Sequence, residues 1–252
     1  MDLTFQGVNI WAAGLIFARV GAMVMLLPGV GEQAMPARVR LAFALLISAA
    51  LAPHLLDRMP PAPEGGWAGA ILIGGEVLIG LTFGAAARML MSSLATAGTL
   101  IGLETGLAFA QTADPSQAQQ AQLFSVFLGM LGVALLFATG LHRMFLMGIA
   151  GTYELFSPGE APSTGDAAQL ALEATVTSFR VGFQMAVPLI AAGLVFRLGL
   201  GVLARLIPSI QVFFVVLPLQ MLGGFVILAL GISAGMLVWL DSLERYAEWL
   251  GP

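Results

Sequence analysis

Hydrophobic residues run in long blocks along this chain, and polar residues are confined to short interruptions between the blocks. Several blocks approach the roughly 20 residues that a helix needs to cross a hydrocarbon core of about 30 Å. A chain in lipid has to satisfy its backbone hydrogen bonds internally, and helices do so. The pattern therefore predicts an all-α membrane protein with one domain, residues 1–252. About six hydrophobic helical segments are expected: Ile10 to Leu27, Leu41 to Leu56, Trp67 to Ala87, Leu123 to Leu141, Val181 to Leu203 and Val212 to Leu240.

Turn-forming residues mark the interruptions, and a further, more polar helix is expected over Met89 to Gly102. The interval from Ser157 to Asp166 is predicted to be the most solvated part of the chain. The last hydrophobic run is too long for one upright span, at about 45 Å. Pro218 and Gly223-Gly224 lie within it and predict a break or bend. A re-entrant hairpin or two packed half-helices would both fit.

Composition supports the same fold class and narrows the chemistry. Hydrophobic residues make up 59% of the chain and charged residues only 10%, against about 25% in soluble domains. All basic residues are arginines, scattered from Arg19 to Arg245, so no nucleic-acid partner is expected. The chain has no cysteine, and His54 and His142 lie far apart, so no metal or cofactor is expected. The net charge of -4 is equally diffuse.

Some charges occupy positions that lipid does not tolerate well. Arg19, Glu76, Arg180 and Arg197 lie within or beside hydrophobic segments and need a charged partner or water. Two sets of residues recur at steps of four and so share a helix face: Glu76, Gly80, Gly84 and Arg88, and Gly193, Arg197, Gly201 and Arg205.

Small residues allow a neighbouring helix to approach, and the charges can then pair across the contact. We therefore predict a polar seam between subunits or along an aqueous path, formed by Arg19, Glu76, Arg88, Arg197 and Arg205. The alternative is ion pairing within the chain, or arginines that extend toward water from segment ends, as Arg180 could. Close helix packing is also expected along Gly98, Gly102 and Gly106 and at Gly231 and Gly235.

One motif has the form of a hydrolase signature. Residues 231–235 read Gly-Ile-Ser-Ala-Gly, the G-x-S-x-G pattern of a nucleophile elbow. No histidine follows Ser233, and the motif lies in a hydrophobic run without a strand-to-helix context. A dyad with the upstream His142 is the alternative, but no enzyme is predicted.

The most distinctive polar interval separates two hydrophobic segments and runs from Glu104 to Gln122. A Gly and a Phe come first, then Asp114-Pro115, which disfavours helix, and then a glutamine-rich run. On physical grounds alone, an ordinary interhelical loop is the simpler interpretation. If the loop faces a pore, Leu107 and Phe109 could form an apolar constriction. The residues proposed for such a plug are Gly106, Leu107, Phe109, Asp114, Pro115 and Gln119.

This interval resembles the Gly-x-x-Phe-Ala-x-x-x-Asp-Pro-x-x-x-Gln pattern of the FliR family, the export-gate proteins of flagella that also occur in virulence injectisomes. The similarity continues through Arg19-Val20-Gly21-Ala22, the stretch from Pro36 to Ala42, and the turn from Leu155 to Gly159. In the C-terminal part it includes Pro188, the stretch from Leu203 to Pro208, and Pro218-Leu219. Gln211, Val216 and Gln220 depart from the family pattern, and Gln220 stands where lysine is common.

The resemblance implies a multi-pass protein of the bacterial inner membrane and the flagellar basal body. It implies helical hairpins with broken helices that assemble with FliP-like and FliQ-like subunits around a channel, with FlhB-like and FlhA-like components as further partners. Unfolded flagellar proteins would pass through the channel, and residues 106–122 would close it at rest. The resemblance implies no cofactor and no covalent chemistry.

Other functions remain open on the sequence. The same subunit could serve a virulence injectisome instead of a flagellum. A small-solute transporter would show two related halves with broken helices at corresponding positions, and the chain has no convincing internal repeat. The loop arginines divide almost evenly between the two sides of any six-span arrangement, so the positive-inside rule gives no orientation.

Overall fold

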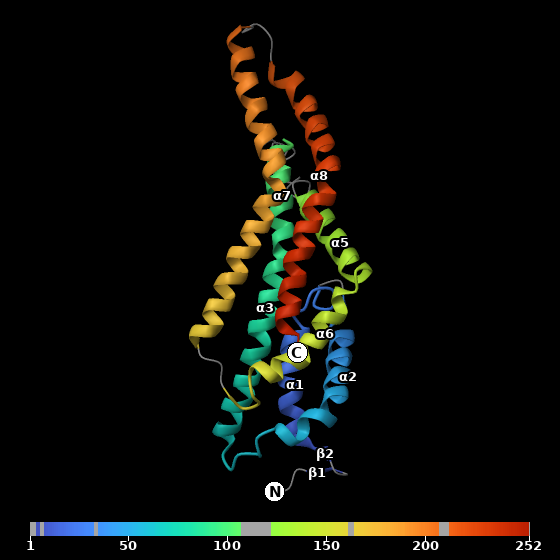
Figure 1. Ribbon diagram of the computed structural model, residues 1–252, viewed down its shortest axis with the longest axis vertical. Coiled ribbons are helices and arrows are strands. Elements are labelled where there is room, and N and C mark those ends of the chain that lie inside the picture. Colours follow the sequence, from blue (N-terminus) through green and yellow to red (C-terminus); the bar gives the residue numbers. More distant parts are fainter. Residues whose placement is uncertain are drawn as a thin grey trace. The chain divides into compact units, whose positions relative to one another are not determined.

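The computed structural model describes residues 4–5, 8–32, 35–106, 122–160, 164–206 and 212–251. These residues are predominantly helical, which confirms the predicted all-α membrane class. A pair of two-residue antiparallel strands, β1 (Thr4–Phe5) and β2 (Val8–Asn9), precedes the helices. The helices are α1 (Ile10–Val24), α2 (Ala37–Leu55), the 3-10 turn η1 (Leu56–Arg58), α3 (Gly66–Glu104), α5 (Leu123–Ala138), α6 (Leu141–Leu155), α7 (Thr164–Leu206) and α8 (Val212–Leu250) (Figure 1).

The chain forms two compact units. Unit 1 comprises Met1–Leu90, Leu136–Val176 and Leu243–Pro252, and unit 2 comprises Met91–Leu135 and Thr177–Ser242. The long helices α3, α7 and α8 each contribute one part to each unit. The division into two units does not test the single domain expected from the sequence, which stays a prediction.

Helix α1 forms the centre of unit 1. Its buried residues include Leu15, Ile16, Val20 and Met23, none of which is exposed at all. At 15 residues the helix is about 22 Å long, which is shorter than a hydrocarbon core. The segment predicted as a first membrane span is therefore a short, enclosed core helix, and the other elements of unit 1 pack around it.

Two glycines bring α3 against α1 in unit 1. A Cβ at Gly80 would collide with the carbonyl oxygen of Arg19 and lie 2.9 Å from the Cβ of Ala22. A Cβ at Gly84 would lie 3.0 Å from the carbonyl oxygen of Met23. The predicted helix face with glycines at steps of four is thus a close contact between helices, and its neighbour is α1 of the same chain.

Unit 2 is built from the end of α3 together with most of α5, α7 and α8. A Cβ at Gly98 would collide with the backbone of Ser125 at the start of α5, so α3 and α5 approach closely there, as predicted. A Cβ at Gly182 of α7 would lie 2.8 Å from the carbonyl oxygen of Ser93 in α3. At Gly231 of α8, by contrast, no neighbouring residue among those described lies within 4 Å of an added Cβ. The expected close packing therefore exists at Gly98 but not at Gly231.

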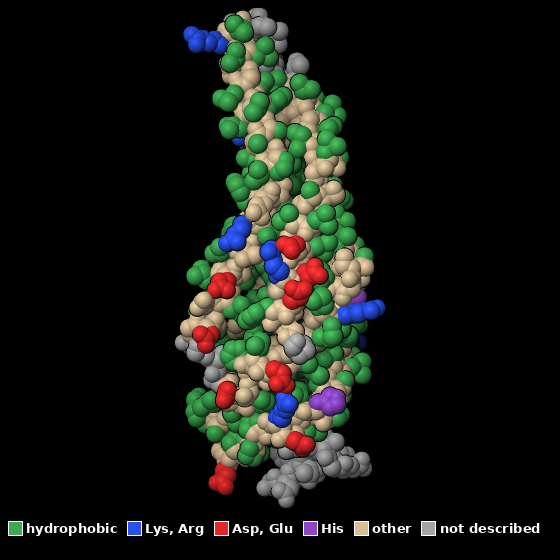
Figure 2. All heavy atoms as spheres, viewed as in Figure 1, with side chains coloured by type: hydrophobic (Ala, Val, Ile, Leu, Met, Phe, Trp, Pro, Cys, Tyr) green, Lys and Arg blue, Asp and Glu red, His purple; other side chains and the backbone are tan. Residues whose placement is uncertain are grey.

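The outer surface of unit 2 is strongly hydrophobic. Large apolar side chains on α7 and α8 are exposed, such as Val195 at 70%, Leu206 at 72% and Leu230 at 79%. Figure 2 shows hydrophobic side chains covering most of the visible face of these two helices. Such a surface needs lipid or another protein to cover it.

In the part of the chain that the structure describes, four helical stretches have the length and composition of membrane spans: Ala37–Arg58, Gly66–Glu104, Gly165–Leu203 and Pro218–Leu250. A fifth is reached if the bent pair Leu123–Ala138 and Leu141–Leu155 counts as one broken span. The chain is therefore a multi-pass membrane protein by these criteria.

The structure changes three sequence-based boundaries. The segments predicted over Trp67 to Ala87 and Met89 to Gly102 form one 39-residue helix, α3. Of the predicted break or bend at Pro218 and Gly223-Gly224, the break is wrong, because α8 continues through all three residues, and the bend stays a prediction. Ending a helix in apolar surroundings leaves several backbone groups unpaired, which costs more than the one hydrogen bond that proline removes. The chain breaks instead between α5 and α6, where Gly140 adopts a φ of 81°.

We predict that Gly80→Ala destabilises unit 1 by roughly 2 kcal/mol or more, because the added methyl group meets backbone atoms of α1 that cannot move aside. Gly74→Ala is the matched control on the same helix, since nothing lies within 4 Å of a Cβ at this position. It should be neutral or stabilising by up to about 1 kcal/mol, through helix propensity. Thermal unfolding of both variants in detergent measures the difference, and equal effects would contradict the close contact.

Candidate functional site

A buried ion pair joins the two helices that the glycines bring together. The Nε of Arg19 lies 2.6 Å from Oε2 of Glu76, and neither side chain has any exposed surface. Arg19 comes from the middle of α1, and Glu76 lies one turn before Gly80 on the same face of α3. Close backbone contact at Gly80 is what lets the carboxylate of Glu76 reach an arginine on the buried helix α1.

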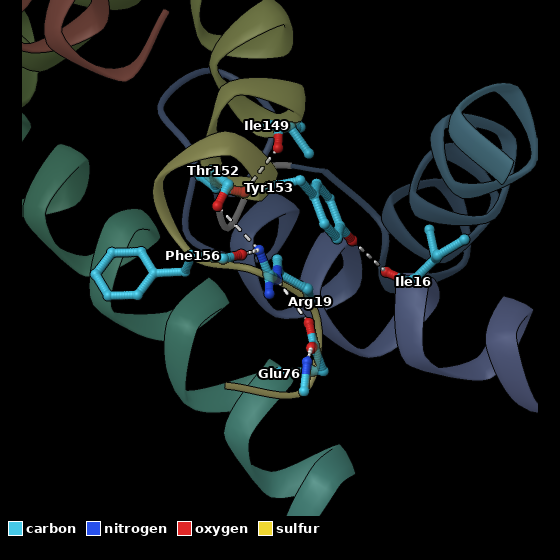
Figure 3. A network of polar contacts seen from close by, with 8 residues as sticks. Ile16, Arg19, Glu76, Ile149, Thr152, Tyr153 and Phe156 are labelled. Carbon is cyan, nitrogen blue, oxygen red and sulfur yellow. Dashed lines mark hydrogen bonds and ion pairs between the residues drawn. The ribbon is translucent and has the colours of Figure 1, made fainter. Parts of the chain in front are cut away.

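The guanidinium group of Arg19 also holds the end of α6. Its Nη1 donates to the carbonyl oxygens of Thr152 at 3.0 Å and Phe156 at 2.9 Å (Figure 3). These carbonyls lie at the C-terminal end of α6, where the helix dipole favours a cation. The carbonyl oxygen of Thr152 also accepts the backbone N–H of Phe156, the residue that follows α6, and Arg19 is its second donor. The ring of Tyr153 lies 4.1 Å from the guanidinium carbon and adds a cation–π contact. Arg19 thus caps α6 from another helix.

The second carboxylate oxygen of Glu76 holds the turn that follows α6. The backbone N–H of Gly159 donates to Oε1 of Glu76 at 2.9 Å. Gly159 has a φ of 85° and follows Pro158 in a turn closed by the bond from Glu160 N to the carbonyl oxygen of Ser157. Proline followed by a glycine with positive φ suits such a turn. One ion pair therefore connects α1, α3, the end of α6 and the turn after it.

Burial of two charges is costly unless nearly all of their polar atoms find partners. Here both oxygens of Glu76 accept hydrogen bonds, whereas the buried Nη2 of Arg19 has no hydrogen-bond partner among the residues that the structure describes. The network is therefore strongly dependent on both members: removing either charge leaves the other buried and unpaired.

The same face of α3 continues to Arg88. Its Nη1 lies 3.8 Å from Oε1 of Glu32 and donates to the carbonyl oxygen of Gly31 at 3.3 Å. Both partners belong to the turn region after α1. Glu76, Gly80, Gly84 and Arg88 thus all face α1 and the residues that follow it, as their spacing predicted for a helix face.

A second polar cluster lies in unit 2, at the end of α3. Nη2 of Arg197 lies 3.0 Å from Oε2 of Glu104, and the side-chain amide of Gln220 donates to the backbone carbonyl oxygen of Glu104 at 2.7 Å. Gly193, four residues before Arg197, makes room for the Glu104 carboxylate, because a Cβ there would collide with Oε2. Helices α7 and α8 thereby hold the last turn of α3, which immediately precedes the proposed plug segment.

Both described flanks of the proposed plug are held by polar contacts in unit 2. On the upstream side, Gly106 follows α3 with a φ of 79°. On the downstream side, the hydroxyl of Ser125 donates to the carbonyl oxygen of Ala95 at 3.0 Å. Of the residues proposed for the plug, only Gly106 belongs to the described part of the chain. Leu107, Phe109, Asp114, Pro115 and Gln119 lie outside the described residues.

The five residues of the predicted polar seam divide into two groups. Arg19, Glu76 and Arg88 have partners within unit 1, which is the arrangement of the intrachain alternative. Arg197 pairs with Glu104 but keeps 56% of its side chain exposed, and Arg205 is exposed. A seam between subunits stays a prediction. Sequence spacing identified the charged faces but not Thr152, Phe156 and Gly159, which contribute only backbone groups.

The hydrolase pattern does not have the structural context of a nucleophile elbow. Ser233 lies in the interior of helix α8, with helix on both sides, and not on a turn between a strand and a helix. Among the described residues, no group of three or more His, Asp or Glu side chains is placed to hold a metal ion.

Comparison with known proteins identifies related chains. Residues 10–246 match the family described as bacterial export proteins, family 1. The flagellar biosynthetic protein FliR of Caulobacter vibrioides is 44% identical over 244 residues, which cover 96% of this chain and 95% of that protein. FliR of Aquifex aeolicus is 30% identical over 219 residues, covering 86% and 84%. FliR of Escherichia coli is 29% identical over 211 residues, covering 84% and 80%.

We predict that Arg19→Ala destabilises the protein by about 3–5 kcal/mol, because it leaves the Glu76 carboxylate buried without a counterion. The double substitution Arg19→Met with Glu76→Leu should recover much of this loss, since no buried charge remains. Arg58→Ala is the control, because the Arg58–Glu154 pair is more than half exposed and should contribute at most about 1 kcal/mol.

The measurements are thermal unfolding in detergent and the amount of protein in the membrane fraction. If Arg19→Ala and Arg58→Ala caused similar losses, the buried network would not have the structural role assigned to it.

Proposed function

The chain belongs to family 1 of the bacterial export proteins, and from this premise we propose that it is a subunit of the flagellar protein export apparatus. The observation that carries the proposal is the 44% identity, over 96% of the chain, to a flagellar biosynthetic protein FliR. The aligned region covers nearly the whole chain, so it contains the residues of the buried network in unit 1 and of the Glu104 cluster in unit 2. As a member of this family, the protein is a component of an export gate and not an enzyme.

The finer proposal is that the chain forms, with FliP-like and FliQ-like subunits, the channel through which unfolded flagellar proteins cross the bacterial inner membrane. FlhB-like and FlhA-like components would complete the apparatus in the flagellar basal body. Support comes from the charges on α7. Arg180 and Arg197 are exposed within the candidate span Gly165–Leu203, where contact with lipid alone would be costly. Contact with other subunits or with water in a channel would remove that cost.

The two alternative uses of such a membrane protein have less support. The relatives reported above are flagellar proteins, which favours the flagellum over a virulence injectisome. A small-solute transporter should have two related halves that enclose a polar site. The described helices do not show two such halves. The N-terminal part begins with the short, buried α1, whereas the C-terminal part consists of the long helices α7 and α8.

We further propose that residues 106–122 close the channel at rest. Support comes from their flanks: the interactions of Arg197 and Gln220 with Glu104 hold the upstream end, and Ser125 holds the downstream end. A plug needs fixed ends and a segment that can be displaced between them. Gln220, at a position where the family commonly has lysine, contributes an uncharged hydrogen bond, so this anchoring does not require a second positive charge.

The first test is copurification from flagellated cells in which a tagged form of this chain is the only copy. We expect FliP-like and FliQ-like subunits to be retained in detergent and motility to be normal. Arg19→Ala should reduce both in parallel, because it disrupts unit 1, whereas Arg58→Ala should change neither. A chain that always purifies alone, from motile cells, would overturn the assembly.

The second test concerns the plug. Deletion of residues 106–122 should raise ion conductance through the assembled complex, measured in planar bilayers, because the constriction proposed at Leu107 and Phe109 would be removed. Deletion of residues 61–63, in the proline-rich turn before α3, is the control for a shortened loop elsewhere. Unchanged conductance in a complex that still copurifies with its partners would contradict the plug.

A further inference from the structure

Unit 1 contains a cavity that neither the ion pair nor the proposed channel accounts for. It has a volume of about 350 Å³ and is lined by residues of α3, the end of α6, the start of α7 and the end of α8. This volume is at the lower end of the range of ligand pockets, roughly 300–1,000 Å³. The cavity therefore has room for one large side chain.

Aromatic rings form one wall of the cavity. The ring of Phe83 lies 5.8 Å from that of Phe156, edge to face, and 5.9 Å from that of Trp249. The hydroxyl of Tyr246 donates to the backbone carbonyl oxygen of Phe83 at 2.8 Å and fixes the meeting of α8 with α3. Arg19 holds the backbone of Phe156. The wall is thus held in place from two sides.

Two acidic residues of α7 also line the cavity. Asp166 and Glu173 are both exposed, and Glu173 accepts a hydrogen bond from the side-chain amide of Gln169 at 2.9 Å. That donor is neutral, so it does not offset the charge of the carboxylate. Among the described residues that line the cavity, none is basic.

We propose that this cavity receives an arginine or lysine side chain from a neighbouring subunit of the export apparatus. The alkyl part of such a side chain would contact Ile79 and Leu170, and its charged end would lie between the aromatic wall and the carboxylate of Glu173. Aromatic faces attract cations, and a carboxylate provides the counterion. A lipid chain would use the apolar wall but would not neutralise the carboxylate of Glu173.

Exposed apolar side chains border the mouth of the cavity, as they do at contacts between proteins. Trp249 is 51% exposed and Leu155 is 47% exposed, so large apolar surfaces border a charged opening. In contacts between proteins, a few residues contribute most of the binding energy, and aromatic residues and arginine are common among them. The inference rests on the proposed function, since it takes the neighbour to be another export subunit.

The test uses a photo-crosslinking residue, p-benzoylphenylalanine, in place of Leu170 in flagellated cells that carry this chain as their only copy. After irradiation, the complex is purified and the adduct is mapped by mass spectrometry. We expect an adduct with another subunit, at or next to an arginine or lysine. An adduct with lipid, an adduct with a segment that has no basic residue, or no adduct would each overturn the proposal.

Substitutions on the two sides of the cavity test the chemistry. Glu173→Arg should reduce the yield of the adduct more than tenfold, and Trp249→Leu by roughly two- to fivefold, because it removes the aromatic face but keeps an apolar side chain. Glu160→Arg, an exposed acidic position of unit 1 that does not line the cavity, is the control and should leave the yield unchanged. Reversing the charge of the mapped basic residue should restore the adduct in the Glu173→Arg variant. Yields unaffected by Glu173→Arg would refute the role of the carboxylate.

The outcome separates this inference from the proposed function. If FliP-like and FliQ-like subunits do not copurify, the proposed function fails. If they copurify while the Leu170 adduct lacks a basic partner, only the cavity assignment fails.

Discussion

The arrangement of unit 1 depends on the burial of one arginine in the middle of a hydrophobic helix. A guanidinium group without water needs a carboxylate, and it needs acceptors for its remaining N–H groups. Arg19 obtains its carboxylate from Glu76 of α3, and its Nη1 finds two acceptors far away in sequence, the carbonyls of Thr152 and Phe156 at the end of α6. The requirement of a single charge therefore brings three helices together.

That requirement also explains the glycines beside it. An arginine on an enclosed helix can meet a carboxylate on a second helix only if the two backbones approach closely, and Gly80 and Gly84 permit the approach. The ion pair then fixes which helix faces meet, since a rotation of α3 would separate Glu76 from Arg19. Apolar packing alone would be less selective, because most faces of these helices are hydrophobic. The polar pair therefore gives specificity as well as attraction.

Periodicity in the sequence correctly identified the face formed by Glu76, Gly80, Gly84 and Arg88, because steps of four residues determine which side chains share a helix face. It could not identify the neighbour, since spacing along one helix contains no information on the element that packs against it. Hydropathy likewise predicts a membrane span for the segment beginning at Ile10, because it does not distinguish lipid from a protein interior. The backbone groups that bind Arg19 and Glu76 have no side-chain signal at all.

The charges of α3 and α7 show where the chain is complete in itself and where it is not. Arg19 and Glu76 are fully enclosed, so each buried charge has its counterion within unit 1. Arg197, in a helix of membrane-span composition, shares Glu104 but leaves more than half of its side chain uncovered. In lipid such an arrangement is costly, whereas contact with a neighbouring subunit or with water would complete it. An isolated helical membrane protein has no reason to keep an exposed arginine beside exposed valine and leucine side chains. The subunit role proposed above would account for it, because other chains would then provide the final surroundings of Arg197.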